Sequence, residues 1–322
     1  VLDELAFALD EKKPIVPVLL KKCRLPYRIR RLQHVDFTGD YEPALKQLLP
    51  NLGILLDSPK KAVRPTAKEK KAQKPAQVKR TPQAPQGMVL IPAGSFLMGS
   101  KDGHNNEKPE HEVALDAFYM DKYQVTVADY RKFLHANKNR EKPDHWDEQL
   151  QYPKRPVVYV NWHDAQAYAN WRGKKLPTEA QWEYAARGGF TGLNNKPKYN
   201  YPRGNDADPQ EANFNHDNSR VWSWEAAKKY LKDVGSYAPN GYGLHDMAGN
   251  AWDWCVDWYD EEYYKNSPAK NPQGPNSGTF RVLRGGSWTY NPNVMRCADR
   301  DRIGPNGRDF YFGFRCVQDV TL

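Results

Sequence analysis

The chain has 322 residues, a formal net charge of +9 and 39% hydrophobic residues. It contains no run of about eighteen apolar residues, which excludes a membrane-spanning helix, and its first residues show no signal-peptide pattern, so we expect a cytoplasmic protein. The positive charge makes a nucleic-acid partner the first hypothesis to test.

Residues 1–56 predict half of an α/β unit. Leucines fall on one helical face in residues 1–9, and residues 14–20 form a short apolar run that fits a buried strand. A second short strand is expected at residues 35–37, followed by an amphipathic helix at residues 41–52.

These elements resemble the C-terminal part of a Toll/interleukin-1 receptor (TIR) domain. The matching segments are residues 4–9, 15–20, 25–26, 35–37 and 40–41. The resemblance implies TIR-type signalling partners, and enzymatic TIR domains cleave NAD with a Glu at the position of Glu4. The strands and loops that would complete a nucleotide pocket are missing from this sequence, so we expect Glu4 to be an exposed helix carboxylate. An NAD-cleaving TIR effector, regulated by the C-terminal domain, is the alternative.

Residues 57–86 hold most of the excess charge, with 9 basic and 2 acidic residues. They also contain five prolines and no aromatic residue, so they cannot bury enough apolar surface to offset the entropy of ordering. Residues 87–322 carry 30 basic and 30 acidic residues. We therefore expect an extended linker over residues 57–86, and no specific nucleic-acid or membrane partner.

Residues 87–322 predict an α+β domain with short strands, few helices and long loops. Two strands are expected around a Pro/Gly turn in residues 88–99, and another in residues 114–119. Helical periodicity appears in residues 126–136 and again in residues 163–172.

A third helix is expected at residues 177–186, where Thr178 fits an N-cap and Gln181 follows three residues later. The rest of the domain reads as loop, turn and short strand. In the helix expected at residues 126–136, the residues expected to face the core are Val127, Tyr130, Phe133 and Leu134.

Ordered motifs in this domain resemble the formylglycine-generating-enzyme/sulfatase-modifying family. The matching segments are residues 91–96, 98–99, 125–126, 156–162, 176–187, 240–254, 282–288 and 313–315. The resemblance implies an elaborated C-type-lectin-like fold for residues 87–322.

Enzymes of this family oxidise a substrate cysteine with a pair of cysteines that follows the Gly-Gly-Ser segment, and such a thiolate pair binds copper. Here Tyr290 stands at the first cysteine position, and no cysteine follows until Cys297. Cys297 lies in a more general Arg-Cys-Ala context. We therefore predict a protein without enzymatic activity, with a divergent formylglycine-generating oxidase as a further alternative.

Residues 288–312 have an unusual composition that resembles the variable region of diversity-generating-retroelement target proteins. In that class, miscopied template adenines in Asn codons yield a residue set without Lys, Glu, Gln, Met or Trp. Between Trp288 and Gly313 the only member of the excluded set is Met295, which we interpret as fixed.

The variable-region interpretation predicts a surface that binds a ligand through stiff aromatic and adaptable polar side chains. We expect Tyr290, Asp301, Phe310, Tyr311 and Phe312 to be the main contacts, although Phe310 or Phe312 is expected to pack inward. The full set of candidate ligand-binding residues is Thr289, Tyr290, Asn291, Asn293, Val294, Cys297, Asp299, Asp301, Arg302, Ile303, Gly304, Gly307, Asp309, Phe310, Tyr311 and Phe312.

The family resemblance also implies a structural calcium site, formed by Asp246, the carbonyls of Gly249 and Ala251, and Asp253. Carboxylate and carbonyl oxygens suit this ion. Asp253 stands where the family has Glu, and its shorter arm leaves calcium binding open.

A second group of potential metal ligands comprises His104, Glu107, His111 and Glu112, which we expect to be exposed polar residues. Taken together, the sequence predicts a ligand-binding protein that requires no cofactor. Its ligand is an unidentified protein, peptide or small molecule.

Overall fold

The computed structural model describes residues 84–215 and 222–320. The TIR-like segment, Glu4 and most of the expected linker lie outside the described residues. The helices are α3 (Val127–Ala136), α4 (Trp146–Gln149), α5 (Trp162–Trp171), α6 (Glu179–Ala186) and α7 (Trp224–Tyr230). The strands are β1 (Met88–Ile91), β2 (Gly94–Met98), β3 (His111–Leu115), β4 (Phe118–Asp121), β5 (Trp252–Trp258), β6 (Arg281–Arg284), β7 (Asp301–Ile303), β8 (Phe312–Gly313) and β9 (Val317–Asp319). None of the described helices is long and apolar enough to cross a membrane.

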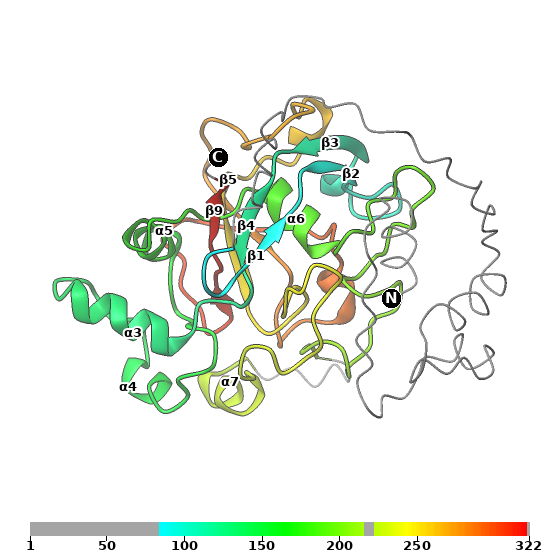
Figure 1. Ribbon diagram of the computed structural model, residues 1–322. Coiled ribbons are helices and arrows are strands. Elements are labelled where there is room, and N and C mark those ends of the chain that lie inside the picture. Colours follow the sequence, from blue (N-terminus) through cyan, green and yellow to red (C-terminus); the bar gives the residue numbers. More distant parts are fainter. Residues whose placement is uncertain (1–83, 216–221, 321–322) are drawn as a thin grey trace, which may run out of the picture. The chain divides into compact units, whose positions relative to one another are not determined.

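Strand β4 is the centre of a three-stranded antiparallel sheet in the order β1-β4-β9, and Figure 1 shows it between the other two strands. Tyr119 faces Leu90 on one side and Gln318 on the other. Strands β2 and β3 form a separate antiparallel pair. The single strand predicted for residues 114–119 is therefore wrong. The chain changes sheets at exposed Asp116, because β3 and β4 pair with different partners.

The second main sheet has the order β7-β6-β5-β8. Strand β6 is antiparallel to both of its neighbours, whereas β8 lies parallel to β5, with Phe312 opposite Trp252. The register of β5 with β6 shifts between Trp254 and Trp258. Strands β7 and β8 lie within or at the end of the candidate variable region, so this sheet fixes where that region lies.

The three predicted helices are confirmed, and each begins at a polar side chain that accepts a backbone N–H. Thr126 caps α3. Asn161 and Asp164 form a reciprocal capping box at the start of α5, and Thr178 and Gln181 form another at α6. Such caps satisfy N–H groups that have no partner within the helix. Helices α4 and α7 were not predicted, because their four and seven residues are too short to show a clear period.

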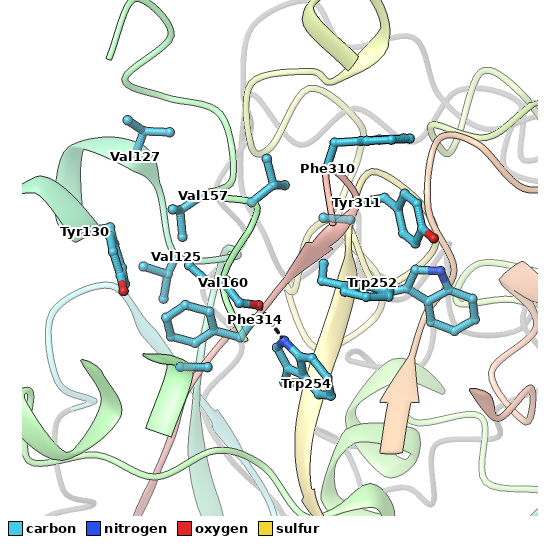
Figure 2. Close-up of a cluster of buried hydrophobic side chains, with 14 of the residues drawn as sticks. Val125, Val127, Tyr130, Val157, Val160, Trp252, Trp254, Phe310, Tyr311 and Phe314 are labelled. Carbon is cyan, nitrogen blue, oxygen red and sulfur yellow. Dashed lines mark hydrogen bonds between the residues drawn. The ribbon is translucent and has the colours of Figure 1, made fainter. Parts of the chain in front are cut away.

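One of the two large apolar clusters includes Phe310, Tyr311 and Phe312 of the candidate variable region, the first two of which are labelled in Figure 2. Tyr130 of α3 contributes to it, and of the inward residues predicted for that helix only Leu134 is not fully buried. Trp254 is completely buried, and its Nε1 donates to the carbonyl oxygen of Val160 at 2.9 Å. The indole polar atom is therefore satisfied inside the cluster.

A buried ionic network lies beside the second apolar cluster. Glu183 is fully buried and accepts hydrogen bonds from Arg187 and Arg284, each at 2.5 Å. Burial alone would raise the pKa of Glu183, but the positive charges of the two arginines have the larger effect and lower it. Removal of one partner from such a network leaves an unpaired buried charge, which is strongly destabilising. These ion pairs therefore favour the arrangement around β6 in which each of these charges keeps its partner.

Candidate functional site

Four arginines in residues 288–315 each pair with a carboxylate from elsewhere in the chain, and we call them the anchoring arginines. The pairs are Arg296–Glu107, Arg300–Glu179, Arg308–Asp164 and Arg315–Asp253. The carboxylate side chains are nearly inaccessible, with exposed fractions between 0% and 9%. The segment is therefore fixed to the rest of the domain at four points along its length.

The candidate ligand-binding residues, which lie before and between these points, divide into two groups. The buried group is Thr289, Cys297, Asp299, Phe310, Tyr311 and Phe312. The accessible or half-buried group is Tyr290, Asn291, Asn293, Val294, Asp301, Arg302, Ile303, Gly304, Gly307 and Asp309.

The three consecutive aromatic residues are all buried, which corrects their prediction as main contacts. Phe310, Tyr311 and Phe312 are 8%, 7% and 6% exposed. The backbone carbonyl of Tyr311 accepts a hydrogen bond from the backbone N–H of Trp252. The ring of Tyr311 lies edge-on to those of Phe310 and Phe312, with interplanar angles of 83° and 80°. The irregular backbone before β8 lets successive side chains enter one core, which a regular helix or strand does not allow.

The accessible aromatic surface is centred on Trp222, which the sequence analysis did not identify. Its side chain is 48% exposed and contacts Tyr290 and Tyr311 edge-on, with ring centroids 5.3 and 5.4 Å apart. Tyr290 also lies edge-on to Trp252 at 5.6 Å. We call these four residues the aromatic cluster; Trp222 and Tyr290 are its accessible members, whereas Tyr311 and Trp252 are buried. Large, stiff rings such as the two accessible ones offer contact area at little cost in conformational entropy.

A second aromatic group continues from Phe310. Tyr159 lies 6.2 Å from Phe310, and the ring of His145 stacks on Trp224 at 4.9 Å. Tyr159 and His145 both have left-handed backbone conformations, with φ of 59° and 54°, and their rings are 5.5 Å apart. Two neighbouring residues held in a strained conformation are typical of functional surfaces.

Asp309 is an acidic residue of the candidate variable region next to Phe310. Its carboxylate accepts from the Phe310 N–H at 2.8 Å and from the Tyr311 hydroxyl. Burial raises the pKa of Asp309. The site therefore combines a partly desolvated carboxylate with aromatic edges and faces.

Two buried indole N–H groups in the same region find no acceptor within residues 84–215 and 222–320. They belong to Trp252 and Trp288. Trp288 stacks on Tyr230 at 5.6 Å and lies 5.9 Å from Phe310. A buried donor without a partner carries a desolvation cost.

The described cysteines do not form a catalytic pair. Cys255, Cys297 and Cys316 are free and buried. Burial raises the pKa of Cys297 to about 11, and raises those of Cys255 and Cys316 well above the ordinary value. All three thiols therefore stay protonated at neutral pH, and Tyr290 occupies the position where the family resemblance places the first catalytic cysteine.

The implied calcium ligands do not fit the ion in this arrangement. Gln124 donates to the Ala251 carbonyl at 2.6 Å and to Asp253 at 3.1 Å. The other oxygen of Asp253 accepts from Trp182 and from the cationic Arg315. An arginine thus supplies the positive charge at Asp253, and the Ala251 carbonyl and both carboxylate oxygens of Asp253 already accept hydrogen bonds. The calcium ligands that the family resemblance implied are Asp246, Gly249, Ala251 and Asp253.

The expectation that His104 and Glu107 are both exposed is wrong for Glu107, which is fully buried. Oxygen atoms of Glu107 and Asp299 and a nitrogen atom of His104 lie within 4.8 Å of one another. Arg296 already binds both oxygens of Glu107, at 2.6 and 2.7 Å, so this group is an ion-pair network rather than an open metal site. The other two residues of the potential metal-ligand group, His111 and Glu112, lie outside this ion-pair network.

The small sheets, the long loops between them and the segment held by the anchoring arginines define a C-type-lectin-like domain of the formylglycine-generating-enzyme type. Residues 73–320 match the family model of the sulfatase-modifying factor enzyme 1-like domain. The chain belongs to this family.

Relatives in the family carry different names. The formylglycine-generating enzyme of Streptomyces coelicolor is 35% identical over 298 residues, which cover 75% of this chain and 92% of that protein. The serine/threonine-protein kinase pkn1 of Chlamydia caviae is 38% identical over 253 residues. That match covers 72% of this chain but only 38% of the kinase, so this chain spans well under half of that relative.

A solved structure, variable protein 1 of Treponema denticola, superposes with a TM-score of 0.57 at 24% identity. The alignment covers 72% of this chain and 95% of that one. The likeness establishes a shared fold, which agrees with the fold expected from the sequence.

Proposed function

We propose that this chain is a non-enzymatic ligand-binding protein, which displays a diversified surface on residues 288–312 and is linked to TIR-type signalling through residues 1–56. The observation that carries the proposal is the separation of roles within the segment. The anchoring arginines and the buried residues hold the backbone, while ten of the candidate residues stay accessible or half-buried. Substitution at accessible positions usually changes stability little.

The chemistry of the accessible surface supports a protein, peptide or small organic ligand. Trp222 and Tyr290 supply aromatic edges, Asn291 and Asn293 supply adaptable hydrogen-bonding groups, and Asp309 supplies a carboxylate. Rigid aromatic anchors beside adaptable polar groups are typical of binding surfaces that accept varied partners.

The state of the thiols supports the absence of oxidase activity. The formylglycine reaction of the family requires a reactive thiol pair, whereas Tyr290 stands at the position of the first cysteine, and Cys297, the next cysteine along the chain, is fully buried. The test is incubation of the copper-treated protein with a cysteine-containing peptide, followed by mass spectrometry. We expect no oxidation of the peptide; conversion of its cysteine to an aldehyde would assign the chain to the enzymes of the family.

Diversification is tested in the DNA next to the gene. The proposal expects a near-copy of the segment that encodes residues 281–317, and a reverse-transcriptase reading frame beside it. Mismatches between the two copies should fall at adenines of the template. A neighbourhood without both elements, or mismatches spread over all bases, would contradict diversification while leaving ligand binding to be measured separately.

A further inference from the structure

Arg281, the first residue of β6, lies between two tryptophan rings. Its Cζ is 3.4 Å from the ring centroid of Trp258, the residue opposite it on β5, and 3.8 Å from that of Trp162 at the start of α5. The rings cover both faces of the planar guanidinium by cation–π contact. Only the edge of the group is left to bind a hydrogen-bond acceptor.

This guanidinium has no carboxylate ion-pair partner within residues 84–215 and 222–320. Its Nη1 donates to the Val256 carbonyl at 2.5 Å, whereas its Nε is buried and has no acceptor. Burial lowers the pKa of Arg281 to about 10, and the charge that opposes this shift is Asp257. Burial and the nearby Glu179 raise the pKa of Asp257 to about 8, so Asp257 is mostly protonated at neutral pH. Asp257 therefore offsets the positive charge of Arg281 only in part, and it forms no ion pair with it.

Arg281 thus differs from the anchoring arginines, each of which binds a carboxylate in the folded chain. The residue is also partly exposed, and of its guanidinium nitrogens only Nη1 has an acceptor within the described residues. Its cross-strand neighbour on β7 is Ile303, and the backbone N–H of Trp162 donates to the carbonyl of Pro305. The Trp–Arg–Trp stack therefore borders the accessible part of residues 288–312.

We propose that Arg281, held between Trp162 and Trp258, is a binding site for an oxyanion, that is, a carboxylate or phosphate group. A planar guanidinium presents its N–H groups in the geometry that such groups accept. The flanking indoles exclude water from its faces, and a lower local dielectric strengthens the attraction to an anion. This site stands on its own contacts and does not depend on diversification of residues 288–312.

The experiment titrates the full chain with sodium acetate or with inorganic phosphate, at constant ionic strength maintained with sodium chloride. Tryptophan fluorescence is a direct readout because both rings contact the guanidinium, and the thermal midpoint is a second readout because a ligand of the native state raises it. We expect a saturable change in both. A response to acetate alone assigns the site to carboxylates, and one to phosphate alone assigns it to phosphate groups.

Two substitutions separate specific binding from general charge screening. Arg281→Lys keeps a cation between the rings but lacks the planar fork, so we expect affinity at least about tenfold weaker. Arg281→Gln should abolish the response. Arg172→Gln is the matched control, since Arg172 is an exposed arginine 5.6 Å from the ring of Trp171, and it should bind like the unmodified chain. Absence of a saturable response in the unmodified chain would overturn the proposal. So would equal responses in the unmodified chain and folded Arg281→Lys.

Discussion

The guanidinium of Arg300 and the carboxylate of Glu179 form two hydrogen bonds, of 2.7 and 2.9 Å, across 121 positions of sequence. Both side chains are buried. Glu179 is the first residue of α6, and Arg300 immediately precedes β7. The pair therefore ties the candidate variable region to a helix whose position is already set by its own capping box and core contacts.

Arg300→Met should lower the free energy of unfolding by about 3–5 kcal/mol, because it removes both hydrogen bonds to buried Glu179 and leaves only the more distant Arg284, at 3.7 Å, to offset its charge. Chemical denaturation measures the change. Lys175→Met is the control, since its pair with Asp319 has side chains more than 60% exposed and such pairs contribute only about 0–1 kcal/mol. Equal effects of the two substitutions would contradict an anchoring role for Arg300.

The two groups of candidate residues should differ in their tolerance of substitution. Asn293→Tyr changes an exposed side chain, so we expect the free energy of unfolding to change by no more than about 0.5 kcal/mol. Tyr311→Ala removes a buried ring and should cost about 3–5 kcal/mol. Denaturation curves of both variants check this. A large loss at Asn293, or none at Tyr311, would show that the buried and accessible groups are assigned incorrectly.

The three described thiols should be unreactive in the folded domain. In a Cys23→Ser variant, a thiol reagent at pH 8 should label Cys255, Cys297 and Cys316 no faster than the domain unfolds, because the reactive thiolate is scarce when burial raises the pKa. All three should react at once in denaturant. Rapid labelling of Cys297 in the folded protein would reveal an accessible thiol and favour the oxidase alternative.

The buried carboxyl of Asp257 should make stability depend on pH. Its pKa is about 8 in the folded chain against an ordinary value of 3.8, so between these values the native state holds a proton that the unfolded chain has lost. Its contribution to stability therefore falls as the pH rises through that window. Relative to the unmodified chain, Asp257→Asn should become progressively more stable from about pH 4 to about pH 8.

Unfolding curves at several pH values test the Asp257 prediction, and Asp102→Asn, at an exposed position, is the control. The difference between Asp102→Asn and the unmodified chain should be constant with pH. Parallel pH profiles for Asp257→Asn and the unmodified chain would contradict a raised pKa at this residue.

Helices α3, α5 and α6 could be predicted because their signals are local. A capping side chain and an apolar period lie within about ten residues of each other in each case. The strand break at Asp116 could not be predicted, because it depends on β3 and β4 choosing different partners. That choice involves β9, which lies some two hundred residues further along the chain.

The candidate site was predicted only in part for the same reason. Composition indicated residues 288–312, but the contact of Trp222 with Tyr290 is a tertiary contact without a sequence signal. The ion pair of Asp253 with Arg315 also joins distant positions. The local motif that implied a calcium ligand at Asp253 therefore could not indicate that Asp253 binds Arg315. The Trp–Arg–Trp stack at Arg281 depends on a cross-strand register that no local pattern specifies.

The burial of Phe310, Tyr311 and Phe312 sets a limit on the repertoire that a diversifying gene could use. Variants with Asp or Gly at these positions would lose buried rings, and losses of about 3–5 kcal/mol each approach the total stability of a typical domain. Many copies would then fail to fold before any encounter with a ligand. The usable diversity would therefore be set by the fraction of sequences that keep this aromatic core, and clones recovered from a population should be far less varied at 310–312 than at Asn291 or Asn293.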